Sequence, residues 1–284
     1  MDLWLLLQIS RPGLWLVFIW LYLWPCGGRH YLLNESNFWL GLVYCTFPLN
    51  LLVYGMNDLV DSDTDKKNTR KGNFIFGAKA PLSKLRRLPN VMAHVNGGFI
   101  LFLTAINLDV FYMFWLFAAV LVNAAYNWQP LVLSRRAPWE LPCMIIGHFL
   151  IPILSCHLNK LPYPGVGSWV FHALLLARSH LWLEMMDIAE DRSCGKRTVA
   201  VVIGKHATLV LILALTVLES ITGFTLLHSH VLGFFSAFGA VLLLLMHVAD
   251  SLGLKVDQKM VSISQSLVGV LLMLHVWDRG DLIA

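Results

Sequence analysis

The chain has 284 residues, of which 57% are hydrophobic and 13% charged, with a formal net charge of +4. A soluble domain carries about 25% charged residues, so this composition and the long apolar runs exclude a soluble protein and indicate a polytopic membrane protein. The modest net charge gives no reason to expect a nucleic-acid partner. The five cysteines show no CxxC pair and no metal-finger spacing, so we expect free thiols.

The first apolar run follows a short lead-in, Met1–Gln8, which lacks the basic start and the cleavage site of a signal peptide. Ser10, Arg11 and Pro12 then open the first spanning helix, because a capping residue followed by an early proline is typical of a helix start.

Nine segments are apolar over about the 20 residues that a spanning helix needs. We therefore expect an all-α polytopic membrane protein with nine transmembrane helices. There is no low-complexity linker, so residues 1–284 are expected to form a single domain. The segments cover residues 12–24 with flanks, 38–57, 88–107, 110–127, 139–158, 166–187, 206–227, 231–249 and 260–277.

The basic residues support this count. If the nine segments alternate in direction, most of the 21 Lys and Arg side chains fall in loops on one side. The positive-inside rule makes that side cytoplasmic. The N-terminus and the two long polar loops, at about 57–88 and 184–205, are therefore predicted to be cytoplasmic, and the C-terminus is predicted to lie outside.

The first polar loop opens with the stretch NDLVDSDTDKKN, which we call the first acidic box. Asn57, Asp61 and Asp65 follow a four-residue step, and on a helix they and Asp58 would share an arc of roughly 100°. Carboxylates at membrane depth cost at least ~2.5–3.5 kcal/mol each, so such a row needs a cation or water beside it.

The second polar loop opens with EMMDIAEDRSCGKRTVAVVIG, the second acidic box. Asp187 and Asp191 would lie about 40° apart on a helix, with Glu184 on the same face. His180 shares that face, where it is expected to hydrogen-bond Glu184 or to line the site. Arg178 is offset from the face and is expected to pair with a neighbouring helix.

Carboxylates clustered without His or Cys partners favour Mg²⁺, which binds through one or two carboxylates and the phosphates of a substrate. Basic side chains follow each box and would neutralise phosphate oxygens. A solvated loop is an ordinary explanation for one such box, but two boxes with the same step and the same basic sequel predict a Mg²⁺–diphosphate site. The bases are Lys66, Lys67, Arg70 and Lys71 after the first box, and Arg192, Lys196 and Arg197 after the second.

The pattern Asn57-Asp58-x-x-Asp61-x-x-x-Asp65 resembles the first signature of the UbiA family of intramembrane prenyltransferases. Asp187-x-x-x-Asp191-x-x-x-Gly195-Lys196-x-Thr198, followed by Val201 and Gly204, resembles the second, and Arg11-Pro12 also fits. The resemblance covers nearly the whole chain. It implies a helical bundle around a central cavity open to lipid, with Mg²⁺ bound between the two boxes and a prenyl diphosphate.

The resemblance also implies a set of site residues. After the fourth segment, Tyr126 and Pro130 match the family, but Val132 and Ser134 stand where it often has Arg and Lys, so Arg135 or Arg136 would take the phosphate role. Glu184 stands where the family often has Asp or Asn. The expected Mg²⁺ ligands are Asn57, Asp61, Asp65, Asp187 and Asp191, of which the four aspartates are catalytic; the expected substrate-binding residues are Asn57, Asp58, Lys67, Arg70, Tyr126, Arg135, Glu184, Lys196 and Arg197.

The chemistry predicted for such a site is ionisation of an allylic diphosphate, followed by attack of a small aromatic or lipid-like acceptor on the allylic cation. Aromatic walls would shield that cation from water. A membrane terpene cyclase with the same metal site is the alternative. A cation or metabolite transporter is less favoured, because both boxes lie at segment ends beside phosphate-type bases. Asn123 and Asn127 either line the site or make interhelical hydrogen bonds.

Overall fold

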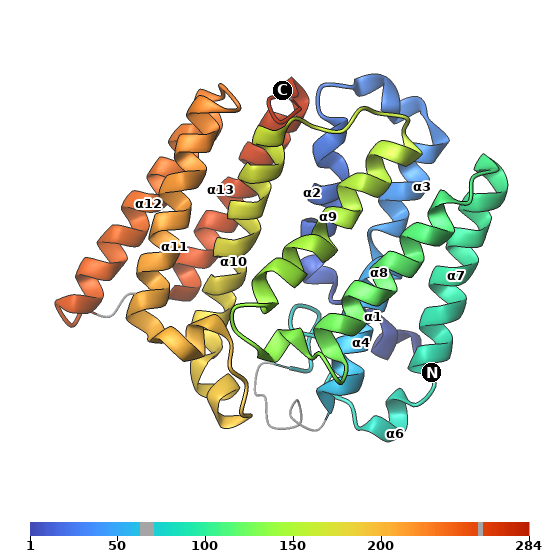
Figure 1. The fold of residues 1–284 in the computed structure, drawn as a ribbon, viewed down its shortest axis with the longest axis horizontal. Coiled ribbons are helices and arrows are strands. Elements are labelled where there is room, and N and C mark those ends of the chain that lie inside the picture. Colours follow the sequence, from blue (N-terminus) through green and yellow to red (C-terminus); the bar gives the residue numbers. More distant parts are fainter. Residues whose placement is uncertain (63–70, 255–257, 284) are drawn as a thin grey trace. The chain divides into compact units, whose positions relative to one another are not determined.

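The computed structural model describes residues 1–62, 71–254 and 258–283 (Figure 1). In these ranges the chain is helical, and the one β-type pairing is an isolated bridge between Asn73 and Gly77. Each of the nine expected segments is helical, which confirms the all-α class and the nine-helix count. Asp65, Lys67 and Arg70 lie outside the described residues.

The chain forms two compact units. The first contains Met1–Leu23 and Leu32–Leu161, and the second contains Trp24–Tyr31 and Pro162–Ala284. The connection after the first spanning segment therefore belongs to the second unit. The sequence predicts a single domain, and this division into two compact units does not test that prediction.

In the first unit, α2 packs against α9, α4 packs against α1, α7 and α8, and α7 and α8 lie side by side as an antiparallel pair (Figure 1). The helices of this unit are α1 (Leu3–Ser10), α2 (Trp15–Leu23), α3 (Ser36–Tyr44), α4 (Phe47–Val60), α6 (Leu82–Leu85), α7 (Leu88–Asn107), α8 (Phe111–Asn127) and α9 (Glu140–Leu158), with 3₁₀ turns η1 (Pro12–Leu14) and η4 (Leu133–Arg135).

In the second unit, α11 packs along both α10 and α12 (Figure 1). The helices of this unit are α10 (Val166–Ser193), α11 (Val199–Thr225), α12 (His230–Ser251) and α13 (Gln258–Arg279), with the 3₁₀ turn η2 (Trp24–Cys26). Thr198 caps α11 by accepting a hydrogen bond from the Val201 N–H, and Gly204 kinks the same helix with a φ of 81°. That backbone conformation is readily adopted by glycine alone, because it has no Cβ.

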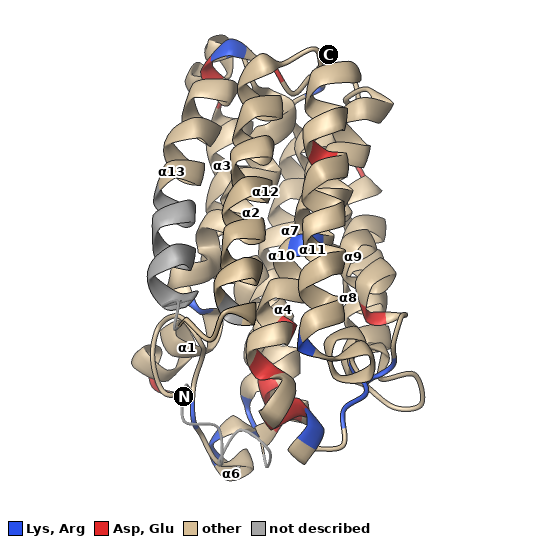
Figure 2. Ribbon diagram, turned by 90° about the vertical axis from the view of Figure 1, so that its left-hand side faces the viewer, with Lys and Arg blue, Asp and Glu red and all other residues tan. Residues whose placement is uncertain are grey.

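The helices are mostly apolar, and their charged residues gather near the helix ends (Figure 2). Six described helices are long and apolar enough to cross a membrane, and α8 is a shorter apolar helix; the six are Leu3–Cys26, Ser36–Val60, Leu82–Asn107, Glu140–Leu158, Val199–Thr225 and His230–Ala249. The protein is thus an integral multi-pass membrane protein, as expected. Its orientation stays a prediction.

The second spanning segment is broken where α3 gives way to α4. Pro48 in the first turn of α4 has no N–H to donate, so carbonyls before it lose their helical partner. The fully buried side chain of Asn50 donates to the carbonyls of Cys45 at 2.8 Å and Thr46 at 2.7 Å. This local repair keeps the helix end that carries the first box in a continuous segment.

Candidate functional site

The first acidic box lies at the C-terminal end of α4. Asn57 and Asp58 belong to the last turn, and Asp61 follows as the C-cap residue, its N–H donating to the Asn57 carbonyl at 2.9 Å. Both Asp58 and Asp61 are buried. Asn57 is the fourth residue from the end of α4, and Asp61 is the first residue after it. The four-residue helical spacing that brings these two side chains together therefore applies as far as the end of the helix.

Asp61 is paired with a base from a distant part of the first unit. The Arg135 Nη2 lies 2.6 Å from Asp61 Oδ1, and the two side chains are 31% and 12% exposed. Arg135 ends η4, the turn between α8 and α9, whereas Arg136 donates to the Pro130 carbonyl at 2.8 Å. The structure therefore places Arg135, of the two candidates, beside the box.

Asp58 lies in a cluster with two cations. Its Oδ1 is 2.7 Å from Arg11 Nη2 and 2.6 Å from Lys71 Nζ, and all three side chains are nearly buried. The Arg11 guanidinium also lies over the ring of Tyr54, 4.4 Å from its centroid. The sequence pointed to Lys71 as a base near the box, but nothing in it signalled the contact with Arg11, which is 47 residues from Asp58.

The N-terminal turn holds the segment after the box. Arg11 adopts a left-handed conformation with a φ of 50°, which turns the chain between α1 and η1. Gly13 N–H donates to the Phe74 carbonyl at 3.0 Å. At Gly77 a Cβ would lie 2.7 Å from Arg11 Nε, so only glycine lets the backbone approach the arginine so closely. These contacts fix the segment that carries Lys71.

On α8, two asparagines near Tyr126 are hydrogen-bonded to each other, and one of them also bonds to α4. Asn123 Nδ2 donates to the Leu52 carbonyl of α4 at 3.2 Å, and Asn127 Nδ2 donates to Asn123 Oδ1 at 2.7 Å. Both are buried. Asn123 holds α8 on α4, about two turns before the first box, which is the interhelical role expected as one of two alternatives, and Asn127 bonds to Asn123 within α8. Tyr126 is half-buried on the same stretch of α8.

The second acidic box lies on α10, which continues to Ser193, six residues past the expected end of its segment. Asp187 and Asp191 are thus helical and one turn apart, as their spacing predicted. Asp187 Oδ1 is buried. Asp191 Oδ1 lies 3.3 Å from Lys196 Nζ, across a turn that Gly195 permits with a φ of 72°. Arg197, after this turn, is exposed.

Glu184 links α10 to α11. Its Oε1 lies 3.2 Å from His180 Nε2, and its Oε2 accepts the Ala200 N–H at 3.4 Å. Glu184 is 6% exposed. The expected contact with His180 is therefore confirmed, and the helix start of α11 adds a second partner that the sequence did not signal.

Arg178 pairs with a neighbouring helix, as expected. Its guanidinium makes a two-point contact with Glu219 of α11, through Nε to Oε2 and through Nη2 to Oε1 at 3.2 Å. Ser236 of α12 donates to Glu219 Oε1 at 2.8 Å. Glu219 is fully buried. Because Arg178 lies opposite the acidic face of α10, this network sets the rotation of the helix that carries the second box.

The donors of both boxes suit Mg²⁺. They are carboxylate and amide oxygens with bases beside them, and no three His, Cys, Asp or Glu side chains form a metal cage in the described residues. Mg²⁺ is commonly held by one or two carboxylates with phosphate oxygens and water completing its shell, rather than by such a cage. A site that relies on substrate phosphates fits this donor set.

The structure thus defines a class of all-helical, multi-pass membrane protein with a carboxylate–base pair at two helix ends. Comparison with known proteins narrows this class: a model of the UbiA prenyltransferase family matches residues 14–267. The chain belongs to the UbiA prenyltransferase family, as its two signatures suggested, and it is a prenyltransferase.

Solved structures share the fold. The UbiA homolog from Archaeoglobus fulgidus bound to DMAPP and Mg²⁺ superposes with a TM-score of 0.71, at 16% identity over 98% of this chain and 99% of that one. The same homolog bound to GPP and Mg²⁺ gives a TM-score of 0.67 at 15% identity, over 98% of this chain and 99% of that one.

Two curated relatives are similar in sequence. A lycopene elongase/hydratase of Corynebacterium glutamicum is 28% identical over 233 residues, which cover 78% of this chain and 77% of that protein. A C(50) beta-cyclic carotenoids biosynthesis protein, LbtBC, of Dietzia sp. is 26% identical over 179 residues, which cover 62% of this chain and 40% of that protein.

Proposed function

We propose that this prenyltransferase uses Mg²⁺ to transfer an isoprenoid chain from a prenyl diphosphate to an apolar acceptor within the membrane. The observation that carries the proposal is the pairing of a box aspartate with a base in each unit: Asp61 with Arg135 at 2.6 Å, and Asp191 with Lys196 at 3.3 Å. An acid that holds a metal beside a base that holds phosphate is the arrangement that a metal-bound diphosphate requires.

In this proposal each box acts through Mg²⁺ on a prenyl diphosphate. Asn57, Asp61 and Asp65 of the first box and Asp187 and Asp191 of the second would hold the metal, which would supply Lewis-acid stabilisation of the departing diphosphate. The phosphate oxygens are bound by Lys67, Arg70, Arg135, Lys196 and Arg197, and Tyr126 contacts the substrate.

Arg135 and Lys196 are proposed to interact first with a carboxylate and then with phosphate. In the structure each neutralises a box carboxylate. With metal bound to the acids, each guanidinium or ammonium would donate to phosphate oxygens instead, where it would stabilise the negative charge that grows as the C–O bond breaks. Asp58 and Glu184 stay predicted substrate-binding residues, although their contacts also hold α1 and α11 in place.

The acceptor proposed is an unsaturated hydrocarbon. The relatives at 26% and 28% identity are named for carotenoid chemistry, one of them as a lycopene elongase/hydratase. A polyene has the π electrons needed to attack an allylic cation and is soluble in the bilayer. The short allylic diphosphates bound by the A. fulgidus homolog, DMAPP and GPP, are the donors to test first.

The test is product analysis with purified protein in lipid nanodiscs. Dimethylallyl or geranyl diphosphate is supplied with lycopene, with an aromatic acid, or without acceptor, and released pyrophosphate and products are measured by mass spectrometry. We expect Mg²⁺-dependent pyrophosphate release and a lycopene product enlarged by one prenyl unit, both lost in EDTA and restored by Mg²⁺. A cyclic product formed without acceptor would identify a cyclase, and full turnover in metal-free buffer would contradict the role of the acids.

A further inference from the structure

The proposed reaction releases a proton that no residue assigned above takes up. When the allylic C–O bond breaks, its electron pair leaves with the diphosphate, and the π electrons of the acceptor form the new C–C bond. The cation left on the acceptor then loses a C–H proton, whose electron pair becomes a new C=C bond, or it captures water, which loses a proton. A base beside the acceptor determines which product forms.

We propose that His180, oriented by Glu184, is this base; the proposal rests on the function proposed above. The two side chains form an i,i+4 pair on α10, with Nε2 and Oε1 3.2 Å apart and with exposed fractions of 21% and 7%. An imidazole held by a carboxylate is a common proton acceptor in enzymes, because the carboxylate orients the ring and stabilises the imidazolium that forms.

The position on α10 suits this role. At 100° per residue, His180, Glu184, Asp187 and Asp191 fall within an arc of about 60°. His180 lies two turns before Asp187, about 10 Å along the axis and toward the middle of the spanning segment. If the diphosphate is held at the aspartates, its hydrocarbon part extends in this direction. The imidazole is therefore on the face, and at the depth, where the new C–C bond would form.

Glu184 is fixed independently of His180. Its second oxygen accepts the Ala200 N–H at 3.4 Å, in the first turn of α11. A carboxylate buried in the spanning region is costly unless a cation stabilises it. A proton arriving at His180 supplies that cation 3.2 Å away, so transfer of the proton to this pair removes charge from the substrate without leaving an isolated charge in the protein.

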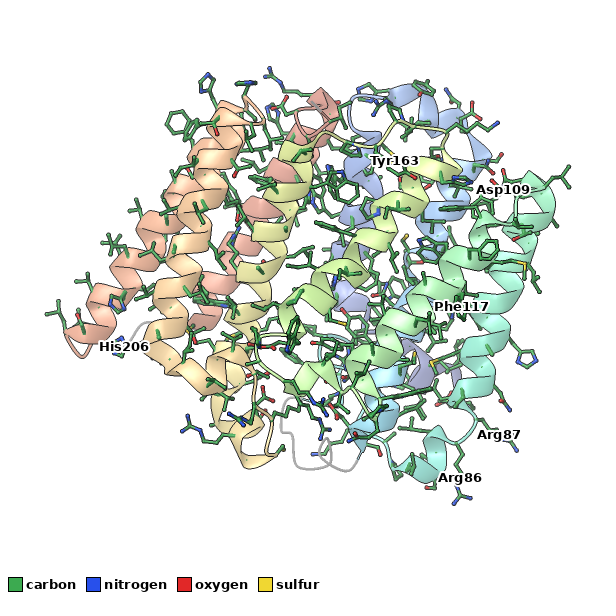
Figure 3. All side chains as sticks on the ribbon, in the orientation of Figure 1. Arg86, Arg87, Asp109, Phe117, Tyr163 and His206 are labelled. Carbon is green, nitrogen blue, oxygen red and sulfur yellow. The ribbon has the colours of Figure 1, made fainter. Side chains whose placement is uncertain are left out.

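Other ionisable groups of the second unit are placed differently. His172 is fully buried, stacked on Trp24 with ring centroids 3.6 Å apart. Arg178 is held by Glu219 on the opposite face of α10 and has no basic lone pair. His206 lies on α11 (Figure 3), and its ring packs edge-on against that of His247, with centroids 5.2 Å apart. None of these shares a face with both aspartates.

The decisive variant is His180→Gln, assayed with dimethylallyl diphosphate and lycopene. Glutamine keeps an N–H donor for Glu184, so the helix junction is retained, but it does not accept the proton. Because general bases contribute about 10²–10⁴-fold, we expect the ratio of alkene to alcohol product to fall at least about tenfold. Pyrophosphate release should change less than about threefold, since ionisation precedes the proton loss. His206→Gln is the matched control and should keep the wild-type ratio.

A second variant separates loss of the base from loss of folding. In His180→Ala, added imidazole should restore the alkene product, because the free base fills the space left by the side chain. An unchanged ratio in a His180 variant that still releases pyrophosphate would overturn the proposal, leaving the diphosphate or water as the base. Absence of prenyl transfer by the wild-type protein would instead overturn the proposed function itself.

Discussion

The two acidic boxes are built in different ways. The carboxylates of the first box are paired across long stretches of chain: Asp58 with Arg11, 47 residues away, and Asp61 with Arg135, 74 residues away. In the second box, Glu184 contacts His180 four residues away and the Ala200 N–H 16 residues away, and Asp191 contacts Lys196 in the turn that follows α10. The pairs named for the first box are thus tertiary, whereas those named for the second are local to α10 and the segment after it.

This difference has a physical consequence. A helix fixes the relative positions of its own side chains, and the Arg178–Glu219 contact helps to set the rotation of α10, which carries the second box. The first box lies where α4 ends, and its geometry depends on α1, on η4 and on the segment that carries Lys71. Substitutions distant in sequence should therefore disturb the first box more than the second.

The largest effect is expected when either box loses one of the aspartates proposed to bind Mg²⁺. Asp61→Ala and Asp187→Ala should each reduce Mg²⁺-dependent pyrophosphate release by at least about 10³-fold, because the interaction is needed where charge develops. The protein should remain folded and extractable from the membrane. Asp278→Ala, at an exposed carboxylate, is the control. Near-normal turnover in either variant would contradict the prediction that both boxes are required for the reaction.

The arrangement of the second acidic box was easier to predict from the sequence than that of the first. The four-residue step of Asp187 and Asp191, the face shared with Glu184 and His180, and the offset of Arg178 all follow from helical periodicity, and α10 has each of them. The spanning segments could be predicted equally well, because the length of the apolar runs and the distribution of basic residues indicate them without tertiary information.

The partners of the first box were less predictable. The sequence offered Arg135 and Arg136 as equivalent, and only the turn at η4 places Arg135 at Asp61. Arg11 was recognised as part of a helix start and a family motif, but its contact with Asp58 depends on a left-handed backbone and on Gly77 next to it. The positive φ of a non-glycine residue and a close glycine are tertiary outcomes with weak sequence signals.

A second prediction compares the buried partners of the boxes. Asp58→Asn leaves Arg11 and Lys71 nearly buried without their carboxylate, and breaking such a pair costs about 3–5 kcal/mol. The variant should unfold at lower denaturant concentration. Glu184→Gln keeps an oxygen that can accept the Ala200 N–H, so it should lower the free energy of unfolding less than Asp58→Asn does. Equal losses of unfolding free energy, measured in mixed micelles, would show that distance in sequence does not distinguish the boxes.

A third prediction concerns the two bases. Arg135→Gln and Lys196→Gln should each raise the KM for the prenyl diphosphate about tenfold, since hydrogen bonds to charged groups contribute about 1.5–3 kcal/mol. Arg136→Gln, whose arginine donates to a backbone carbonyl, is the matched control. If Arg136→Gln raised KM as much as Arg135→Gln, the assignment of Arg135 to the first box would be wrong.

The smallest effect is expected in the turn between α7 and α8, where Asp109 lies (Figure 3). The pKa of Asp109 is lowered from 3.8, first by the Phe111 N–H and then by His157, whose Nε2 is 2.6 Å from Oδ2. A carboxyl with a lowered pKa stabilises the folded state above its unfolded pKa, and this contribution disappears as the pH falls through the folded value. Asp109→Asn should therefore lower the Tm slightly at pH 6, and the difference from wild type should shrink as the pH falls below 3.8. A difference that persists unchanged at pH 3 would assign the effect to packing at the turn and not to the carboxylate.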